Sequence, residues 1–470
     1  MLTNYPGTQD RFTPDILLRQ WILNRFQEVY RELGFHLVET PCLEPVGILA
    51  KSGGVGDQPT FSFTDKHKDD VCLKPDQTVS LRRVVEQHRL RLPFPRHQVG
   101  LAFRQDKPER GRWREFLQCD ADFVGAPLGT ADAETILWLL KGFAAVGLPE
   151  TQLLVNTRAI LSGLYRDLKS DYFDELTYVR AIDKIPSSGD TGTMVEYLSR
   201  LVVSKESLKP VPDSEEAWPK IAKGSEGHTV ILAILNQVAG LESFRVLGQA
   251  REGLAAFAEK YPALEEQVAD LDRVLAYAYE SGVSSDQIVF DPVLARGMDY
   301  YTGPVFECRS ELWPYGSLAG GGRYDNMILV EETPQPSVGA SFGLDRIEQA
   351  LKDLGRVPAE CTQRLADALV ITKPDWLPGA LRVAKTLRDS GLRTIVYPDP
   401  AVTLKLQTRY AAQNSIPVAI FYGPDEQEQG NVTIRSVTPE SDVADPEAAR
   451  QAKNMTVSID QLVNTVRSLG

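Results

Sequence analysis

The residues best suited to chemistry lie in one stretch, LARGMDYYTGPVFECRSELWPYGSLAGGGRYD. Its candidate side chains are an arginine, two adjacent tyrosines and a tyrosine that follows a triple glycine: Arg296, Tyr300, Tyr301 and Tyr324. Arginine offers a fixed fork of donors to a phosphate or carboxylate, and a tyrosine hydroxyl both donates and accepts, which suits a small polar ring such as imidazole. Consecutive glycines let the backbone approach a ligand where a Cβ would collide. Each feature alone fits a glycine-rich hairpin, but the whole string favours a ligand site.

Two segments of this stretch, RGMDYYTGPVFE and AGGGRYD, resemble the signature segments of histidyl-tRNA synthetases, a branch of the class II aminoacyl-tRNA synthetases. The resemblance implies that Arg296 occupies a place where related synthetases use a metal ion and that it is catalytic, meeting the α-phosphate of ATP. It also implies that Tyr300, Tyr301 and Tyr324 belong to the histidine site.

A second stretch, FRQDKPERGRWREFLQCDADFVG, predicts two strands joined by a charged loop. It resembles the second class II motif, which implies that Arg104 grips the α-phosphate and the amino-acid carboxylate. The same motif places ATP against the following residues: Asp106, Arg114 and Phe116. Gln118 and Asp122 are four apart, so a strand puts both on one face with Asp120 between them. There they could hold the ammonium and imidazole groups of histidine. The charged loop, which includes Arg112, also fits a solvated hairpin tip.

Two shorter motifs complete the candidate site. VCLKPDQTVS could be a turn, and in the family this place binds the amino acid, where an acid suits an ammonium group. Asp76 and Thr78 match that pattern. Gln77 stands between them and is counted in the histidine site through its backbone, with its side chain expected to point elsewhere. SVGASFGLDRIEQAL predicts a strand running into a helix. It resembles the third class II motif, which implies that Arg346 stacks on adenine and meets the γ-phosphate.

The remaining pattern predicts the elements that position these residues. A helix beginning at Thr13-Pro14-Asp15, with Thr13 as its cap, precedes a strand over 35–40, and this pair resembles the first class II motif, which implies a homodimer. Residues 164–285 are mostly helical, with a loop expected over 208–219. Strands over 366–372, 393–397 and 417–422 alternate with helices, which predicts a small parallel sheet.

These patterns predict an α+β class II synthetase catalytic domain, an antiparallel sheet flanked by helices, with a helical insertion and a C-terminal α/β anticodon-binding domain. The expected domains are the first catalytic part, the insertion, the second catalytic part and the anticodon-binding domain: 1–163, 164–285, 286–355 and 365–470. In the last domain Lys405 and Arg409 share a helix face and either meet phosphates or are simply solvated.

Composition sets limits on the class of protein. A chain of 470 residues with 43% hydrophobic and 24% charged residues is ordinary for a globular protein. The net charge of −13 argues against coating nucleic acid by charge alone, but it does not exclude one docked RNA. No apolar run is long enough for a membrane span, and the start lacks a secretory signal. The scattered cysteines contain no CxxC pair, so a reducing cytoplasm is expected and no metal motif is indicated.

The resemblance therefore implies ATP-dependent ligation of L-histidine to tRNA(His) through a histidyl-adenylate, with Mg²⁺ accompanying ATP. Two alternatives keep the fold. One is a regulatory subunit of ATP phosphoribosyltransferase, which tends to lose the signature arginines and the C-terminal domain. The other activates histidine without charging tRNA. A plain RNA-binding module is disfavoured by the acidic balance and the ATP-site residues.

Overall fold

The computed structural model describes residues 3–50, 60–170, 172–185, 190–207, 216–245, 248–296, 300–362, 364–437 and 454–469. Contacts between Cα atoms divide the chain into two compact units, Met1–Pro358 and Ala359–Gly470. Most of the expected loop at 208–219 lies outside the described residues.

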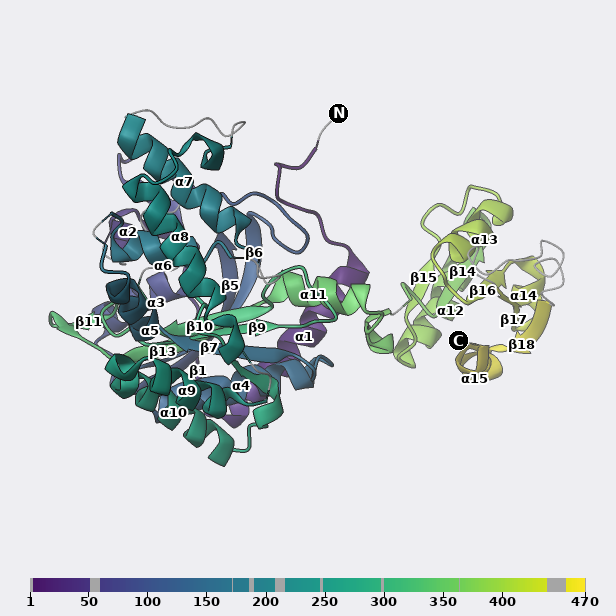
Figure 1. The fold of residues 1–470 in the computed structure, drawn as a ribbon. Coiled ribbons are helices and arrows are strands. Elements are labelled where there is room, and N and C mark those ends of the chain that lie inside the picture. The colour runs from purple at the N-terminus through teal and green to yellow at the C-terminus, as the bar shows by residue number, and fades with distance from the viewer. Residues whose placement is uncertain are drawn as a thin grey trace. The chain divides into compact units, whose positions relative to one another are not determined.

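The first unit is built on an eight-stranded sheet (Figure 1). Its strands, in spatial order, are β1 (His36–Leu37), β5 (Phe94–Phe103), β6 (Glu115–Val124), β13 (Ser337–Gly343), β10 (Ala319–Arg323), β9 (Pro304–Arg309), β7 (Gln152–Thr157) and β8 (Ile288–Phe290). Neighbours are antiparallel except at the two edges, where β1 pairs with β5 and β7 pairs with β8 in parallel. The expected antiparallel sheet is thus confirmed. The strand predicted over 35–40 is shorter, because only His36 and Leu37 pair with β5.

Helices cover one face of this sheet and form the core. They are α1 (Thr13–Glu32), α4 (Thr130–Ala145), α9 (Ala250–Lys260), α10 (Glu265–Glu280) and α11 (Leu344–Asp353). Phe342 of β13 points into this layer, where it stacks on Phe26 of α1 at 4.0 Å between ring centroids. Trp138 and Phe143 of α4 meet the same ring edge-on. Because side chains alternate along a strand, Ser341 and Gly343 beside Phe342 face the opposite side, which leaves that face for the site.

The expected helical region contains α5 (Arg158–Asp167), α6 (Glu175–Ile182), α7 (Gly192–Ser207) and α8 (Glu226–Ala239) in addition to α9 and α10. Helices α6, α7 and α8 gather on the side of the sheet opposite α4, α9 and α10 (Figure 1). The region therefore supplies both a part of the core and a cluster above the other face.

Smaller elements frame the sheet. A three-stranded sheet has the order β2 (Leu43–Pro45), β4 (Asp70–Leu73) and β3 (Ser62–Thr64), and β11 (Leu329–Val330) pairs with β12 (Thr333–Pro334). Helix α2 (Gly47–Ala50) is short, and α3 (Gln77–His88) follows β4. The sequence indicated only a turn at this point, whereas Asp76 caps α3 by accepting from the Val79 amide at 2.9 Å. The cap expected at Thr13 is wrong, because α1 already begins at Thr13 and Phe12 precedes it.

The second unit contains a five-stranded sheet with the order β15 (Thr394–Val396), β14 (Ala368–Thr372), β16 (Val418–Tyr422), β17 (Asn431–Ser436) and β18 (Asn454–Ser458). The first three strands are parallel as predicted. The prediction of a purely parallel sheet was incomplete, because β17 and β18 extend it in antiparallel fashion. The helices are α12 (Leu377–Asp389), α13 (Leu404–Gln413), α14 (Pro424–Gln429) and α15 (Ile459–Leu469).

Candidate active site

A cavity of about 570 Å³ lies over the face of the large sheet opposite α1, α4, α9 and α10. The strand register explains its floor. Asp122 pairs with Gly339 and Asp120 pairs with Ser341, while Ser341 and Gly339 pair in turn with Gly320 and Gly322 on β10. Directly paired residues of antiparallel strands share a face. The floor thus has acids on β6 and little but glycine on β13 and β10.

These glycines are required by close neighbours. A Cβ on Gly320 would lie 2.3 Å from Nη1 of Arg296, and one on Gly339 would lie 2.0 Å from Oδ1 of Asp122. A Cβ on Gly322 would approach the Tyr301 ring to 2.9 Å. Real Cβ atoms do not tolerate such distances. Gly320 and Gly322 therefore make room for the side chains of Arg296 and Tyr301, whereas the sequence predicted room for a ligand.

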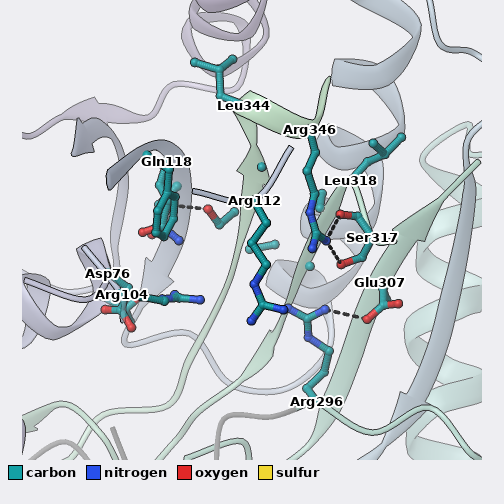
Figure 2. A pocket seen from close by; sticks show the side chains of 18 of the residues that line it. Asp76, Arg104, Arg112, Gln118, Arg296, Glu307, Ser317, Leu318, Leu344 and Arg346 are labelled. Carbon is teal, nitrogen blue, oxygen red and sulfur yellow. Dashed lines mark hydrogen bonds and ion pairs between the residues drawn. The ribbon is translucent and has the colours of Figure 1, made fainter. Parts of the chain in front are cut away.

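Four arginines from separate segments point into the cavity: Arg104, Arg112, Arg296 and Arg346 (Figure 2). Each is oriented by the protein. Arg104 Nε donates to the Pro75 carbonyl at 2.9 Å, and Arg346 Nη1 donates to the Ser317 carbonyl at 2.7 Å. Arg296 Nη1 donates to Oε2 of Glu307 at 2.7 Å, and Arg112 Nη2 donates to Oδ2 of Asp106 at 2.7 Å.

The electrostatics of this cluster favour an anion. Burial and then the positive charge of Arg112 lower the pKa of Arg346, and Arg296 adds to the effect. Burial opposes the charged form of Arg296, but the negative charge of Glu307 outweighs it and raises the pKa of Arg296. Burial would likewise raise the pKa of Glu307, yet Arg296 and Arg309 lower it overall. Positive charges held this close together attract a polyanion such as a triphosphate.

Away from the four arginines, the cavity forms a small polar pocket. The Tyr324 hydroxyl donates to Asp122 Oδ1, and Arg96 Nη2 lies 2.6 Å from Asp122 Oδ2. Burial raises the pKa of Asp122, opposed by Arg96. Tyr300 packs against Tyr301 with ring centroids 4.8 Å apart, and both rings line the cavity. A carboxylate between hydroxyls and aromatic walls suits an imidazole, which needs a partner for each nitrogen.

The amino end of α3 forms another part of the cavity lining. Asp76 uses Oδ1 to cap the helix, and its Oδ2 is buried without a hydrogen-bond partner among the described residues. Gln118 Oε1 is also buried and unpartnered within the described part of the chain. Thr78 lies in the first helical turn and lines the same space. Buried acceptors without donors indicate that a ligand donor belongs there.

Most residues predicted for the site meet in this one cavity: Asp76, Thr78, Arg104, Asp106, Phe116, Gln118, Asp122, Arg296, Tyr300, Tyr301, Tyr324 and Arg346. Two do not line it. Gln77 is fully buried and donates to the Leu101 carbonyl at 3.1 Å. Arg114 donates to the Asp106 and Pro6 carbonyls at 3.1 Å each, so it anchors the N-terminal segment.

Sequence reasoning left several lining residues out. Arg112 fitted a solvated loop charge, and its pairing with Asp106 beside the cavity cannot be predicted from the sequence. Glu307 was read only as part of a strand, although its type is unusual in so buried a run. The sequence placed Asp120 between Gln118 and Asp122 on one face of β6 but gave it no role. Asp183 and Lys184, which follow α6, gave no signal.

Within the described ranges, no group of three or more His, Cys, Asp or Glu side chains is arranged to hold a metal ion. Among the same residues, none of the helices has the length and apolar character needed to cross a bilayer. All five cysteines are free thiols.

The second unit has a cavity of its own, of about 320 Å³. Trp376, Phe421 and Arg435 line it at the end of the parallel strands. The Arg435 guanidinium lies 5.4 Å from the Phe421 ring centroid and its Nε donates to Asn454 at 2.8 Å. Aromatic faces beside an arginine suit an unstacked nucleobase. Lys405 and Arg409 are both exposed on α13, outside this cavity.

Comparison with known proteins agrees with this geometry. Residues 7–347 match the family model described as histidyl-tRNA synthetase, and residues 367–469 match the anticodon binding domain. The chain is 34% identical over 450 residues to a histidine–tRNA ligase of Rhodopirellula baltica, covering 93% of this chain and 94% of that protein. It is also 34% identical to a histidine–tRNA ligase of Wolinella succinogenes, with 92% of each chain covered.

Solved structures share the fold. The histidyl-tRNA synthetase of Nostoc sp. PCC 7120 superposes with a TM-score of 0.64 at 21% identity, over 100% of this chain and 99% of that one. The apo histidyl-tRNA synthetase of S. aureus superposes with a TM-score of 0.62 at 17% identity, over 99% and 100%.

Proposed function

This chain belongs to the histidyl-tRNA synthetase family, and we propose that it ligates L-histidine to tRNA(His) in two steps that share the cavity over the large sheet. One observation carries the assignment of roles. Arg104, Arg296 and Arg346 reach a single cavity from three separate segments, and the Asp122–Tyr324 pair lies in the same cavity.

Histidine recognition is assigned to the polar end. The Asp122 carboxylate and the hydroxyls of Tyr300, Tyr301 and Tyr324 hold the imidazole. Asp76, Thr78 and Gln118 receive the α-ammonium, because two of them present buried acceptors that have no hydrogen-bond partner among the described residues. A site whose polar groups are satisfied only by the right side chain rejects apolar analogues strongly, since those would leave buried groups unpaired.

Activation is assigned to the arginines. A carboxylate oxygen of histidine attacks the α-phosphorus of ATP, the bond to the bridging oxygen breaks, and pyrophosphate leaves with its electron pair. Negative charge concentrates at the α-phosphate, where Arg104 and Arg296 are placed to stabilise it. Arg346 holds the outer phosphates, and Asp106 and Phe116 border the nucleotide. Preorganised donors of this kind contribute about 100-fold to 1000-fold each in comparable sites.

Mg²⁺ is proposed to arrive as part of the ATP complex. The described residues of the cavity do not form a set of metal ligands, and the Glu307 carboxylate is already paired with Arg296 and Arg309. A resident ion therefore does not fit these side chains. When bound with ATP, the ion neutralises phosphate charge, and no role of the protein residues depends on it.

Transfer completes the reaction. A ribose hydroxyl of the terminal adenosine attacks the acyl carbon of the adenylate, and AMP leaves. The second unit supplies the remote contact with tRNA, and we assign the cavity formed by Trp376, Phe421 and Arg435 to an unstacked base of the anticodon loop. Stacking on aromatic faces beside a guanidinium supports this assignment.

A homodimer in a reducing cytoplasm completes the proposal. Exposed apolar side chains on α1 and just before it, Phe12 at 71% and Ile16 at 41%, support an interface there. Free thiols throughout the chain support a reducing compartment. Mass photometry or sedimentation distinguishes a dimer of two 52.1 kDa chains from a monomer.

The test is histidine-dependent pyrophosphate–ATP exchange followed by aminoacylation of a histidine tRNA transcript. Both activities, with no exchange for other amino acids, are expected. Exchange without aminoacylation would assign the chain to a relative that activates histidine without charging tRNA. Histidine binding with neither activity would favour a regulatory subunit.

A further inference from the structure

The histidine end of the cavity contains a third carboxylate, Asp120, that the assignment above leaves without a role. Asp120 is 3% exposed and lines the cavity. Its Oδ1 accepts a hydrogen bond from the Ser341 hydroxyl at 2.5 Å. The partner that fixes it is thus neutral. Among the described residues no cation lies within ion-pair distance of Asp120, because the nearby Arg96 pairs with Asp122 instead, so its burial is costly.

The strand register places Asp120 in the same cross-strand row as Gly320, over which Arg296 lies. Asp120 on β6 pairs with Ser341 on β13, Ser341 pairs with Gly320 on β10, and Gly320 pairs with Glu307 on β9. The Arg296 guanidinium lies over Gly320. Two strand spacings, about 10 Å, separate Asp120 from that guanidinium along the floor. An amino-acid zwitterion with a hydrogen bond at each end spans a similar length.

Some polar neighbours of Asp120 already have hydrogen-bond or ion-pair partners within the protein, and others do not. Asp122 is occupied by Tyr324 and Arg96. Lys74, the other buried cation nearby, donates to Thr40 at 3.1 Å through Nζ. By contrast, Asp76 and Gln118 line the cavity. Asp76 Oδ2 and Gln118 Oε1 are buried and have no hydrogen-bond partner in the described part of the chain. With Asp120 they make three acceptors, and an ammonium group has three N–H donors.

We propose that Asp120 is a specificity-determining residue of the histidine site, which receives the α-ammonium group together with Asp76 and Gln118. This inference rests on the proposed function. Asp120 selects for a protonated amino group, whereas Asp122 with Tyr324 selects for the imidazole. The electrostatics of the cavity agree with this role, because burial and the adjacent Asp122 raise the pKa of Asp120 to about 7 against the opposing charge of Arg96.

The experiment separates the two ends of the substrate. Asp120→Asn keeps the shape and removes the charge. We compare KM for L-histidine in exchange with the inhibition constant of 3-(imidazol-4-yl)propionate, which lacks the amino group. Asp120→Asn should raise KM about 10-fold to 100-fold and leave the inhibition constant of the analogue unchanged within about 2-fold. Asp122→Asn is the contrasting variant, since it should weaken both ligands.

An unchanged KM, or a parallel loss of affinity for both ligands, would overturn the proposal.

If Asp120→Asn does not fold, the wild-type enzyme provides the test, because both ligands share the imidazole and only histidine has the ammonium. The groups facing Asp120 are Arg96 on β5, Asp122 on β6, Asp76 at α3, Lys74 and Tyr30 of α1. The preference for histidine over the analogue should fall as pH drops from 8 to 6 and Asp120 takes up a proton. A flat preference contradicts the inference, whereas absence of exchange in the wild type contradicts the proposed function instead.

Discussion

Arg296 Nη1 donates to Glu307 Oε2 at 2.7 Å, and the two residues come from either side of the tyrosine pair in the sequence. Glu307 also accepts from Arg309 Nε, so one buried carboxylate holds two guanidinium groups. This relationship gives Glu307 a positioning role, because it fixes Arg296 without having to touch the substrate itself.

Glu307→Gln should therefore lower the rate of histidine-dependent exchange. The variant retains the volume but removes the charge that orients Arg296, and a displacement of about 1 Å at a reacting centre costs roughly 100-fold. The kcat of exchange should fall by 10-fold to 100-fold, with a smaller change in KM for histidine. Glu311→Gln is the matched control, because the exposed Glu311 accepts from Gln152 at 3.3 Å and lies outside the cavity. Equal activity of the two variants would contradict the positioning role.

Arg296→Ala tests the proposed catalytic role directly. If Arg296 stabilises the α-phosphate as we propose, its removal should reduce kcat of exchange by at least about 100-fold, while the fold is retained. Arg251→Ala serves as a control, since Arg251 pairs with Asp272 on the surface at 2.6 Å. Near-normal exchange in Arg296→Ala, with Arg251→Ala also active, would show that Arg296 has no part in the chemistry.

Gly320→Ala tests the same contact from the backbone side. The new Cβ would lie 2.3 Å from Arg296 Nη1, and the flexible arginine must move because the strand cannot. Exchange should fall by about 100-fold, close to the effect of Arg296→Ala, and circular dichroism should remain unchanged. Gly47→Ala is the control, because no atom of the described residues lies within 4 Å of a Cβ there. Wild-type exchange in Gly320→Ala would mean that Arg296 does not depend on this glycine.

The sequence predicted those parts of the candidate site that depend on a local pattern. The alternation at Gln118 and Asp122 placed both on one face of β6, as the register confirms. The pairing of β6 with β13, and of β13 in turn with β10, brings together residues about 200 positions apart in the chain. Such long-range pairings are not encoded in any local pattern. That is why Ser341 and Glu307 escaped notice.

The direction of a side chain is a second feature that the sequence does not determine. A motif fixes residue types, but Arg114 donates to carbonyls of the N-terminal segment, which depends on where that segment returns to the sheet. Similarly, the cap at Asp76 begins a helix that the sequence could not distinguish from a turn, because Asp favours both. In the second unit, β17 and β18 were missed since the βαβ rhythm ends before them.

The Arg323–Asp132 pair should dominate the stability of the large sheet. Arg323 donates through Nε at 2.9 Å and through Nη2 at 2.5 Å to the two oxygens of Asp132, and both side chains are at most 2% exposed. Arg323→Met leaves Asp132 buried without its cation, which should lower the free energy of unfolding by about 3–5 kcal/mol. Urea denaturation measures this change. Arg251→Met should cost at most about 1 kcal/mol, since its pair is exposed.

A double substitution identifies the cause. Combining Arg323→Met with Asp132→Leu should recover part of the loss, because the uncompensated charge is then gone. Strictly additive losses would mean that packing, not the buried ion pair, accounts for the effect.

The cavity of the second unit should govern tRNA binding alone. Trp376→Ala and Arg435→Ala remove a stacking face and a guanidinium, and stacking of one base is worth about 1–3 kcal/mol. Each variant should raise KM for tRNA in aminoacylation by about 5-fold to 150-fold and leave pyrophosphate–ATP exchange unchanged. Arg409→Ala on the exposed face of α13 is the control for loss of a surface charge. Loss of exchange in Trp376→Ala, or an equal effect of all three variants, would contradict the assignment.

His97 should make stability depend on pH. It is 6% exposed, stacks on Tyr30 with ring centroids 4.9 Å apart, and its pKa is lowered to about 4 by burial and then by Arg96. An unfolded histidine has a pKa of about 6.5. Between these values the unfolded chain binds more protons, so stability rises with pH through this window and is lost as pH falls from about 6.5 to about 4. The full loss is about 3 kcal/mol.

His97→Phe isolates this effect, because phenylalanine keeps the ring against Tyr30 and cannot titrate. The difference in unfolding free energy between wild type and variant, measured by urea denaturation at several pH values, should change by about 3 kcal/mol between pH 7 and pH 4. Taking this difference removes the contribution of Asp120, whose raised pKa acts in the opposite direction. His88→Phe, which removes an exposed imidazole at the end of α3, is the matched control. If the wild-type and His97→Phe curves stay parallel over this range, the buried imidazole does not control acid stability.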